Sequence, residues 1–250
     1  MSQAIANGFR GIDTACQPKH YNEAGVGAAV AASVRAGLAR EQLYLQTKFT
    51  PLGGQDPKRI PYDPAAPLAE QVAQSIAVSL RNLQTDYIDC LVLHSPLRKM
   101  KDTEQVWQAM QAAHASGTVK QLGISNCYDL SVVKQLHHFA SVKPAVVQNR
   151  FYADTDYDVG IRAFCREQGI DYQSFWTLTA NPHVLEHEQT RRLAGKYHVT
   201  PAQVLFRYLA EIDIVPLTGT TSEVHMREDL AVFDFALTAA ERDSMGALFQ

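Results

Sequence analysis

Short apolar segments alternate along the chain with longer segments of helical periodicity. The apolar segments have the length of β-strands, and most reach a polar residue near their carboxyl end; they cover residues 10–13, 43–49, 87–94, 119–126, 145–151, 170–176 and 214–217. The helical segments cover residues 23–37, 68–83, 103–116, 129–140, 159–168, 200–209 and the stretch that starts at 238. Regular alternation predicts a parallel sheet, and polar residues confined to strand ends are typical of a barrel with one active face.

We therefore predict an α/β fold of the (β/α)8 TIM-type barrel class, formed as a single domain by residues 1–250. Seven strands are predicted, and residues 2–8 look like the end of a helix that leads into the first of them. A closed barrel needs eight strands, so either an opening strand is absent or another segment covers the gap. The loop 51–67 is long for an α/β unit, which predicts that it is functional.

Four positions carry signals for a helix start. Thr200 precedes a proline, and Thr238 stands three residues before Glu241, as in a capping box. Thr103 and Asp129 are also expected to be N-caps.

Composition narrows the class of protein. Of 250 residues, 46% are apolar and 20% are charged, which is ordinary for a soluble domain. The net charge of −3 without a basic stripe argues against nucleic acid as a partner. No membrane partner is expected, because no apolar run has the length of a membrane span. Four cysteines without a C-x-x-C motif, and no secretory signal, predict a cytoplasmic protein with buried free thiols.

Four side chains near the first strand ends form a candidate chemical group: Asp13, Tyr21, Lys48 and His94. An isolated tyrosine is a weak acid, with a pKa of about 10, and a nearby ammonium would lower that pKa. A buried Lys48 would need Asp13 as a partner, and His94 could hydrogen-bond a carbonyl oxygen. Such a group can deliver a proton to an oxygen while a hydride reaches its carbon.

The chain resembles the aldo-keto reductase superfamily from Ala4 to about Leu248. The resemblance rests on Gly8-Phe9-Arg10-Gly11-Ile12-Asp13-Thr14-Ala15, Tyr21-Asn22-Glu23, Thr47-Lys48, Leu93-His94-Ser95-Pro96, Gly123-Ile124-Ser125-Asn126 and Val147-Gln148-Asn149, in that order. It implies NAD(P)H-dependent reduction of an aldehyde or ketone. Tyr21 would be the general acid, Lys48 and Asp13 the pair that tunes it, and His94 the group that orients the carbonyl.

The same resemblance implies a set of cofactor-binding residues. Ser125, Asn126 and Gln148 would hold the carboxamide of the nicotinamide, and Phe175 would stack on its ring, beside Trp176 and Leu178. Near the last strand, hydroxyls that can donate hydrogen bonds to the 2′-phosphate of NADP are those of Thr218, Thr220 and Ser222, and Arg227 could reach the same phosphate. His225 and Asp229 are also predicted to bind the cofactor, and Asp229 stands where the family often has asparagine. Leu217 and His225 stand where the family often has lysine and arginine. NADP(H) is favoured on family grounds, with NAD(H) as the second choice, and no metal is expected.

This sequence departs from the family pattern in three ways. His20, rather than Tyr21, stands in the usual tyrosine register before Asn22; we choose Tyr21, because a loop can absorb one residue and an imidazole cannot replace a phenol. The usual N-terminal hairpin and first strand are not found. The loop 97–101 is short, which predicts an open pocket for a small-molecule carbonyl substrate that can be bulky.

Several alternatives remain open at this point. The chain could be a nicotinamide-binding barrel that acts as a redox sensor or interaction module with little turnover, or a truncated reductase. Tyr44 and Lys48 have the spacing of a short-chain dehydrogenase pair, but this pairing requires a helix, and the segment reads as a strand. Gly27 is expected to allow close helix packing, and Trp107 and Trp176 to pack in the core or against the cofactor. Oligomeric state and natural substrate are not predicted.

Overall fold

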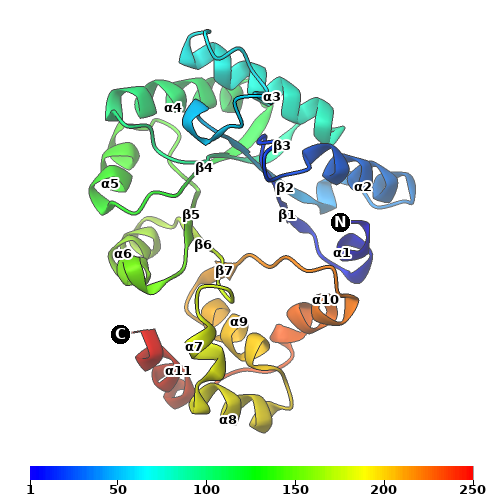
Figure 1. Ribbon diagram of the computed structural model, residues 1–250, viewed down its shortest axis with the longest axis vertical. Coiled ribbons are helices and arrows are strands. Elements are labelled where there is room, and N and C mark those ends of the chain that lie inside the picture. The colour runs from blue at the N-terminus through cyan, green and yellow to red at the C-terminus, as the bar shows by residue number, and fades with distance from the viewer. Residues whose placement is uncertain (250) are drawn as a thin grey trace. The chain divides into compact units, whose positions relative to one another are not determined.

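In the computed structural model, which describes residues 1–249, the chain forms two compact units, Met1–Val147 and Gln148–Gln250. Seven strands follow one another in chain order in the sheet (Figure 1). They are β1 Gly11–Asp13, β2 Tyr44–Phe49, β3 Ile88–Leu93, β4 Val119–Ser125, β5 Val146–Arg150, β6 Asp171–Phe175 and β7 Ile214–Pro216. The β1–β2, β2–β3, β3–β4 and β6–β7 pairs are parallel, which confirms the predicted parallel sheet.

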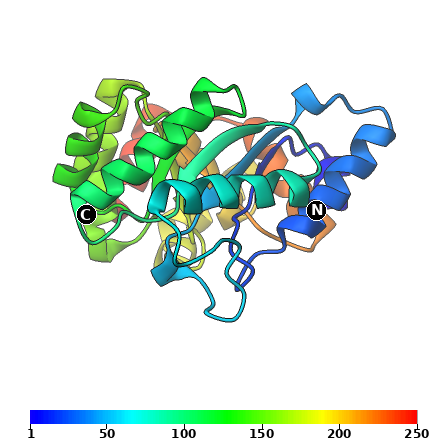
Figure 2. The ribbon, with the colours of Figure 1, turned by 90° about the horizontal axis from the view of Figure 1, so that it is seen from above.

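Helices connect the strands of the first unit. They are α1 Ser2–Asn7, α2 Glu23–Arg35, α3 Leu68–Leu83, α4 Met100–Ala115 and α5 Leu130–Phe139, with short 3₁₀ turns at Arg40–Gln42 and Leu52–Gly54. Helix α3 packs against both α2 and α4 (Figures 1 and 2). The predicted role of Gly27 is confirmed, because a β-carbon there would collide with the backbone of Asn82 and Leu83 in α3.

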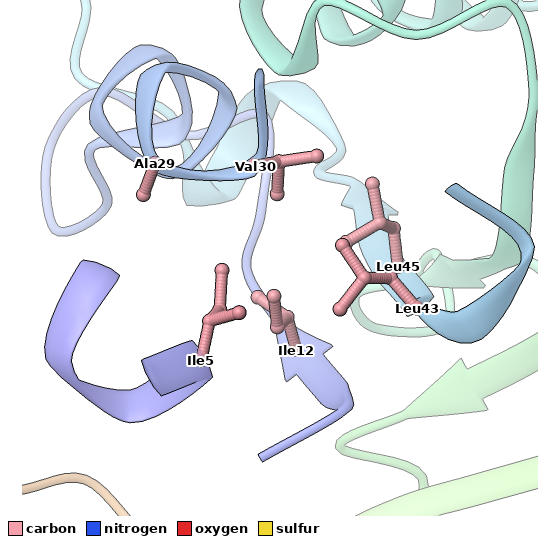
Figure 3. Packing of buried hydrophobic residues seen from close by; sticks show 6 residues of the cluster. All are labelled: Ile5, Ile12, Ala29, Val30, Leu43 and Leu45. Carbon is pink, nitrogen blue, oxygen red and sulfur yellow. The ribbon is translucent and has the colours of Figure 1, made fainter. Parts of the chain in front are cut away.

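Apolar residues from α1, α2 and the first two strands form one part of the core of the first unit (Figure 3). Ile12 of β1 and Leu45 of β2 are neighbours in the sheet register, and each is at least 96% buried. The remaining members of this cluster are Ile5, Ala29, Val30 and Leu43. Burial of each large side chain contributes roughly 2 kcal/mol, so this cluster fixes β1 and β2 and, with them, the residues that follow both strands.

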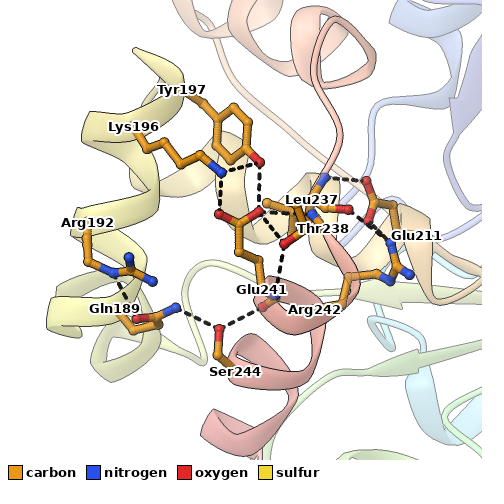
Figure 4. A network of polar contacts seen from close by, with 10 residues as sticks. All are labelled: Gln189, Arg192, Lys196, Tyr197, Glu211, Leu237, Thr238, Glu241, Arg242 and Ser244. Carbon is orange, nitrogen blue, oxygen red and sulfur yellow. Dashed lines mark hydrogen bonds and ion pairs between the residues drawn. The ribbon is translucent and has the colours of Figure 1, made fainter.

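The second unit holds the helices α6 Val159–Gln168, α7 Pro182–Glu186, α8 Glu188–Tyr197, α9 Pro201–Glu211, α10 Glu223–Leu230 and α11 Ala239–Gly246. Short 3₁₀ turns lie at Ala153–Asp158, Ala231–Phe233 and Ala247–Phe249. Glu241 joins α11 to α8, since its carboxylate accepts hydrogen bonds from Lys196 at 2.6 Å and Tyr197 at 2.7 Å (Figure 4). The capping boxes predicted at Thr200 and Thr238 are confirmed.

The N-cap predicted at Thr103 is wrong. Helix α4 begins at Met100, three residues earlier, and Thr103 is fully buried inside it. The Thr103 hydroxyl accepts a hydrogen bond from the backbone N–H of Leu97 at 2.9 Å instead. A threonine in the first turn of a helix can bond a backbone group of the preceding loop, and the sequence alone does not separate that role from an N-cap. The N-cap predicted at Asp129 is confirmed.

The expectation about the cysteines is confirmed, and the expectation about the two tryptophans is wrong in part. Cys16, Cys90, Cys127 and Cys165 are all buried free thiols, as predicted. Trp107 is fully buried and donates a hydrogen bond to the Val142 carbonyl, whereas Trp176 is 55% exposed, so a core role for Trp176 is wrong. Within residues 1–249, no helix is long and apolar enough to cross a bilayer. The absence of an opening hairpin and the single-domain organisation stay predictions.

Candidate active site

The pairing of β1 with β2 brings Asp13 and Lys48 together. Asp13 pairs with Gln46 in the sheet register, and the chain beyond it stays alongside β2, because Thr14 N–H donates to the Gln46 carbonyl at 2.9 Å. The Lys48 ammonium is 1% exposed and contacts both carboxylate oxygens of Asp13 at 2.6 Å and the Thr14 carbonyl at 2.9 Å. Gln46 donates a further hydrogen bond to Asp13 at 2.7 Å. This buried cation is therefore neutralised and fully coordinated by the first unit itself.

Tyr21 lies next to this ion pair. Its ring centroid is 5.5 Å from Lys48 Nζ and 5.9 Å from the centroid of the His94 ring, with the two ring planes at 70°. Lys19 and His20 are exposed, as expected of solvated loop residues. The structure therefore places the Tyr21 ring beside the Lys48 ammonium and the His94 imidazole.

The pKa of Tyr21 differs from the expectation. Burial raises the pKa of the phenol to about 12, and the negative charge of Asp13 adds to the increase. The expectation that Lys48 lowers this pKa is wrong for the unliganded protein. The physical reason is burial of the phenol, which disfavours the phenolate, and the carboxylate of Asp13, which coordinates Lys48 at 2.6 Å, acts in the same direction as burial. Tyr21 consequently keeps its proton throughout the neutral range.

His94 follows β3, and its position is fixed from three sides. Its backbone N–H donates to the Phe49 carbonyl at 2.9 Å, and its carbonyl accepts from the Asn126 side chain at 2.9 Å. Its Nδ1 atom is 2.7 Å from the Thr50 hydroxyl. Burial lowers the pKa of His94 to about 4, and the positive charge of Lys48 acts in the same direction. The imidazole is therefore neutral at neutral pH.

This low pKa predicts an acid-sensitive stability. Histidine in an unfolded chain has a pKa of about 6.5, so between that value and the folded pKa of about 4 the unfolded state binds more protons. Acidification from about pH 7 to about pH 5 should thus reduce the free energy of unfolding by about 2 kcal/mol through His94 alone. Urea unfolding of the wild type and of His94→Gln at both pH values would measure it. An equal loss in the two proteins would contradict the assignment, and exposed His138 replaced by Gln is the matched control.

Ser125 and Asn126 stand at the carboxyl end of β4 in the same unit. Asn126 has a left-handed backbone with φ of 50°, and its side-chain N–H groups donate to the His94 carbonyl and to Ser125 Oγ at 3.2 Å. The Asn126 carbonyl oxygen accepts a hydrogen bond from the Tyr128 hydroxyl at 3.3 Å and has a second acceptor position, and the Ser125 hydroxyl has a donor position of its own. These two positions fit a primary carboxamide, which both donates and accepts hydrogen bonds.

In the second unit, the predicted nicotinamide residues lie within β5, at the end of β6 and directly after it. Gln148 in β5 donates to Gln173 in β6 at 2.9 Å. Phe175 closes β6 and is half-buried, as is Leu178. Trp176 follows with φ of 57°, and its exposed ring lies 4.0 Å from the Arg150 guanidinium carbon. The structure thus presents an aromatic surface backed by a cation at this edge of β6.

The predicted phosphate residues are grouped around the start of α10. Ser222 caps this helix, and Thr220 lies 3.5 Å from His225. The Thr218 hydroxyl donates to the Asp229 carboxylate at 2.6 Å, and burial raises the pKa of Asp229. Arg227 is exposed and lies 3.9 Å from Glu223. The group therefore combines hydroxyl donors with a carboxylate, and its one arginine already faces another carboxylate.

Two residues of the first unit that contact the candidate site were missed in the sequence. Gln46 binds Asp13, and Thr50 binds His94. Alternation along β2 places Gln46, Lys48 and Thr50 on the same face of the strand, which is the signal that could have identified both.

Comparison with known proteins agrees with this geometry. The model of the aldo/keto reductase family matches residues 1–248. Glyoxal reductase of Bacillus subtilis is 30% identical over 98% of this chain and 80% of its own length. The 2,5-diketo-D-gluconic acid reductase B of a Corynebacterium species is 32% identical over 99% of this chain and 82% of its own length.

Solved structures give the same result. An aldo-keto reductase from a Medee basin deep-sea metagenome library aligns with a TM-score of 0.83 at 24% identity, covering 99% of this chain and 84% of its own. Bombyx mori aldo-keto reductase in complex with NADP aligns with a TM-score of 0.83 at 25% identity, covering 99% of this chain and 80% of its own. The fold class is confirmed as the (β/α)8 TIM-type barrel. The chain belongs to the aldo/keto reductase family and is an oxidoreductase of that class.

Proposed function

We propose that this protein reduces aldehydes or ketones to alcohols with NADPH or NADH, and that Tyr21 donates the proton. The observation that carries this proposal is the group formed by Tyr21, the Lys48–Asp13 ion pair and His94 within one unit. Relatives named for the reduction of glyoxal and 2,5-diketo-D-gluconic acid support small carbonyl compounds as substrates. A nicotinamide, when bound, supplies the hydride that the carbonyl carbon accepts.

The residues of the first unit then handle the proton. As the carbon accepts hydride, the carbonyl oxygen becomes a developing alkoxide, which is a stronger base than a phenolate. The Tyr21 phenol, still protonated because its pKa is about 12, transfers its proton to that oxygen. The Lys48 ammonium stabilises the phenolate that remains, and Asp13 keeps the ammonium in place. Neutral His94 donates a hydrogen bond to the same oxygen and orients it.

A carbonyl panel tests the proposal directly. Oxidation of NADPH and NADH would be followed in parallel with glyoxal, methylglyoxal, a keto sugar acid and a bulky aromatic ketone. Carbonyl-dependent oxidation is expected for at least the small dicarbonyls, and turnover of the ketone would support the predicted open pocket. Tight cofactor binding without oxidation across the panel would support the redox-sensor alternative instead.

We infer further that Asp229 weakens the binding of NADPH relative to that of NADH. Its carboxylate holds Thr218, one of the predicted phosphate donors, and places a negative charge where NADPH would bring a phosphate. Asp229→Asn should therefore lower the KM for NADPH about tenfold, which corresponds to about 1.4 kcal/mol, with little change for NADH. The measurement is steady-state KM for both cofactors, with exposed Asp234→Asn as the control. An equal change for NADPH and NADH would show that Asp229 does not face the phosphate.

A further inference from the structure

The Thr50 hydroxyl has one hydrogen-bond partner in the described chain. Thr50 follows β2 directly and is 3% exposed. Its Oγ1 lies 2.7 Å from His94 Nδ1, and over residues 1–249 no second partner of this hydroxyl is found. Because a buried hydroxyl hydrogen needs an acceptor, this hydrogen must point at the imidazole.

That requirement fixes the tautomer of His94. A neutral imidazole carries one N–H and one lone pair. If Nδ1 carried the hydrogen, Nδ1–H would face the Thr50 oxygen, and the threonine hydrogen would have no acceptor among residues 1–249. If Nδ1 carries the lone pair, the threonine hydroxyl donates to it and both groups are satisfied. The hydrogen of the imidazole then lies on Nε2.

We propose that Thr50 is a positioning residue for the reduction, which holds His94 in the Nε2–H tautomer and so makes it a hydrogen-bond donor to the carbonyl oxygen. The catalytic part of this inference rests on the proposed function. The opposite tautomer would present a lone pair to that oxygen and repel it. A hydrogen bond at the second nitrogen of a functional histidine is the usual means by which a protein selects one tautomer.

The long loop 51–67 holds Thr50 in turn. The Tyr62 hydroxyl donates to the Thr50 carbonyl at 2.8 Å, and the Gln55 side chain donates to the same carbonyl at 3.1 Å. Gln55 also donates to the Cys16 carbonyl at 3.0 Å, in the segment that leads to Tyr21. Both side chains are at least 94% buried. The loop therefore connects the backbone before Tyr21 with Thr50, which is the hydrogen-bond partner of His94.

The choice of tautomer matters only while the His94 imidazole is neutral, because a protonated ring carries a hydrogen on both nitrogens. Burial and the Lys48 charge keep the pKa of His94 near 4, so a single neutral tautomer can persist across the working pH range. The titratable groups whose charge acts on this ring are Lys48, Asp13 and His20.

The experiment uses ¹⁵N-histidine spectra of the unliganded protein at pH 7, together with kcat/KM. In the wild type, His94 should show Nε2–H and a lone pair on Nδ1. Thr50→Val, which keeps the shape and removes the hydroxyl, should give a tautomer mixture and lower kcat/KM about tenfold. Thr50→Ser should restore both properties, and Tyr62→Phe should give an intermediate tautomer mixture. Thr47→Val, which removes a buried hydroxyl bonded to Glu23 at 2.6 Å, is the matched control and should leave the spectrum of His94 unchanged.

Two results would overturn the inference. One is an Nδ1–H tautomer in the wild type, which the spectrum shows even if Thr50→Val does not fold. The other is an unchanged spectrum and unchanged kcat/KM in folded Thr50→Val. A wild type without carbonyl turnover would overturn the proposed function, and the spectrum would still decide the tautomer, so the two failures are distinguishable.

Discussion

Tyr21→Phe is expected to lower kcat about 1,000-fold while the Kd for NADPH or NADH stays within about twofold. Phenylalanine keeps the ring that contacts His94 and Lys48 and removes only the hydroxyl group, and with it the acidic hydrogen. If Tyr21 delivers this hydrogen to the carbonyl oxygen, the alkoxide of the variant must take its proton from water instead. Proton transfer from water is slower than transfer from a positioned acid, typically by about 10²–10⁴-fold. Single-turnover kinetics with saturating cofactor and a fluorescence titration of cofactor binding would separate the two quantities.

Tyr44→Phe is the matched control for this variant. Tyr44 lies in β2 and donates to Gln121 at 3.0 Å, so its hydroxyl is bonded away from the ion pair. Its spacing to Lys48 mimics a short-chain dehydrogenase pair, but a strand does not place the two on one helical face. We expect Tyr44→Phe to keep its turnover. Retained turnover in Tyr21→Phe, with loss in His20→Gln, would instead assign the acid role to His20.

The high pKa of Tyr21 adds an expectation to the same experiment. Because burial and Asp13 raise that pKa to about 12, ionisation of the phenol should produce no loss of kcat between pH 7 and 9. A phenol with a lowered pKa would lose its proton within this range and give a falling limb. The pH profile of the wild type therefore tests whether the ion pair acts on the free phenol or only on the phenolate formed during the reaction.

The sequence was sufficient for elements whose pattern is local. Helix α3 was predicted with the bounds it has, because residues 68–83 have regular helical spacing and a proline-containing loop on one side. Strand β2 was predicted within one residue, since the side chains of its two faces alternate regularly along residues 43–48. The capping box at Thr238 was found because both of its members lie within one turn of helix.

Contacts between distant residues were beyond such patterns. The bond from Thr50 to His94 joins positions 44 residues apart, and neither side chain alone indicates it. The raised pKa of Tyr21 comes first from burial of the phenol in the folded chain and then from the charge of Asp13, and neither is a property of a local motif. Exposure of Trp176 follows from a left-handed backbone immediately after β6, which redirects the side chain away from the core.

Lys48→Met should reduce the free energy of unfolding by about 3 kcal/mol and lower kcat by two to three orders of magnitude (about 10²–10³). The methionine fills the space of the lysine stem but leaves Asp13 without the ammonium that binds both of its oxygens. The Asp13 side chain is 20% exposed and keeps the Gln46 hydrogen bond, which places the stability loss at the lower end of the range for broken buried ion pairs. Urea unfolding and steady-state kinetics at pH 7 would measure both effects.

A double variant distinguishes the structural from the catalytic role of the pair. Asp13→Asn combined with Lys48→Met removes both charges, so no unpaired carboxylate remains and most of the lost stability should return. Turnover should not return, because the phenolate formed at Tyr21 would have no cation beside it. Lys120→Met is the control, since Lys120 is 52% exposed and lies 3.3 Å from Asp89, a pair that should contribute less than about 1 kcal/mol.

The two readouts together decide what the buried pair does. If stability and turnover both recovered in the double variant, the ion pair would serve only the packing of β1 against β2, and the chemical role proposed for Lys48 would fail. If stability recovered and turnover did not, the ammonium would be required by the reaction itself. The structure favours the second result, because the same ammonium that is satisfied by Asp13 and the Thr14 carbonyl also lies 5.5 Å from the Tyr21 ring centroid. A cation needed only for packing would not have to face the phenol.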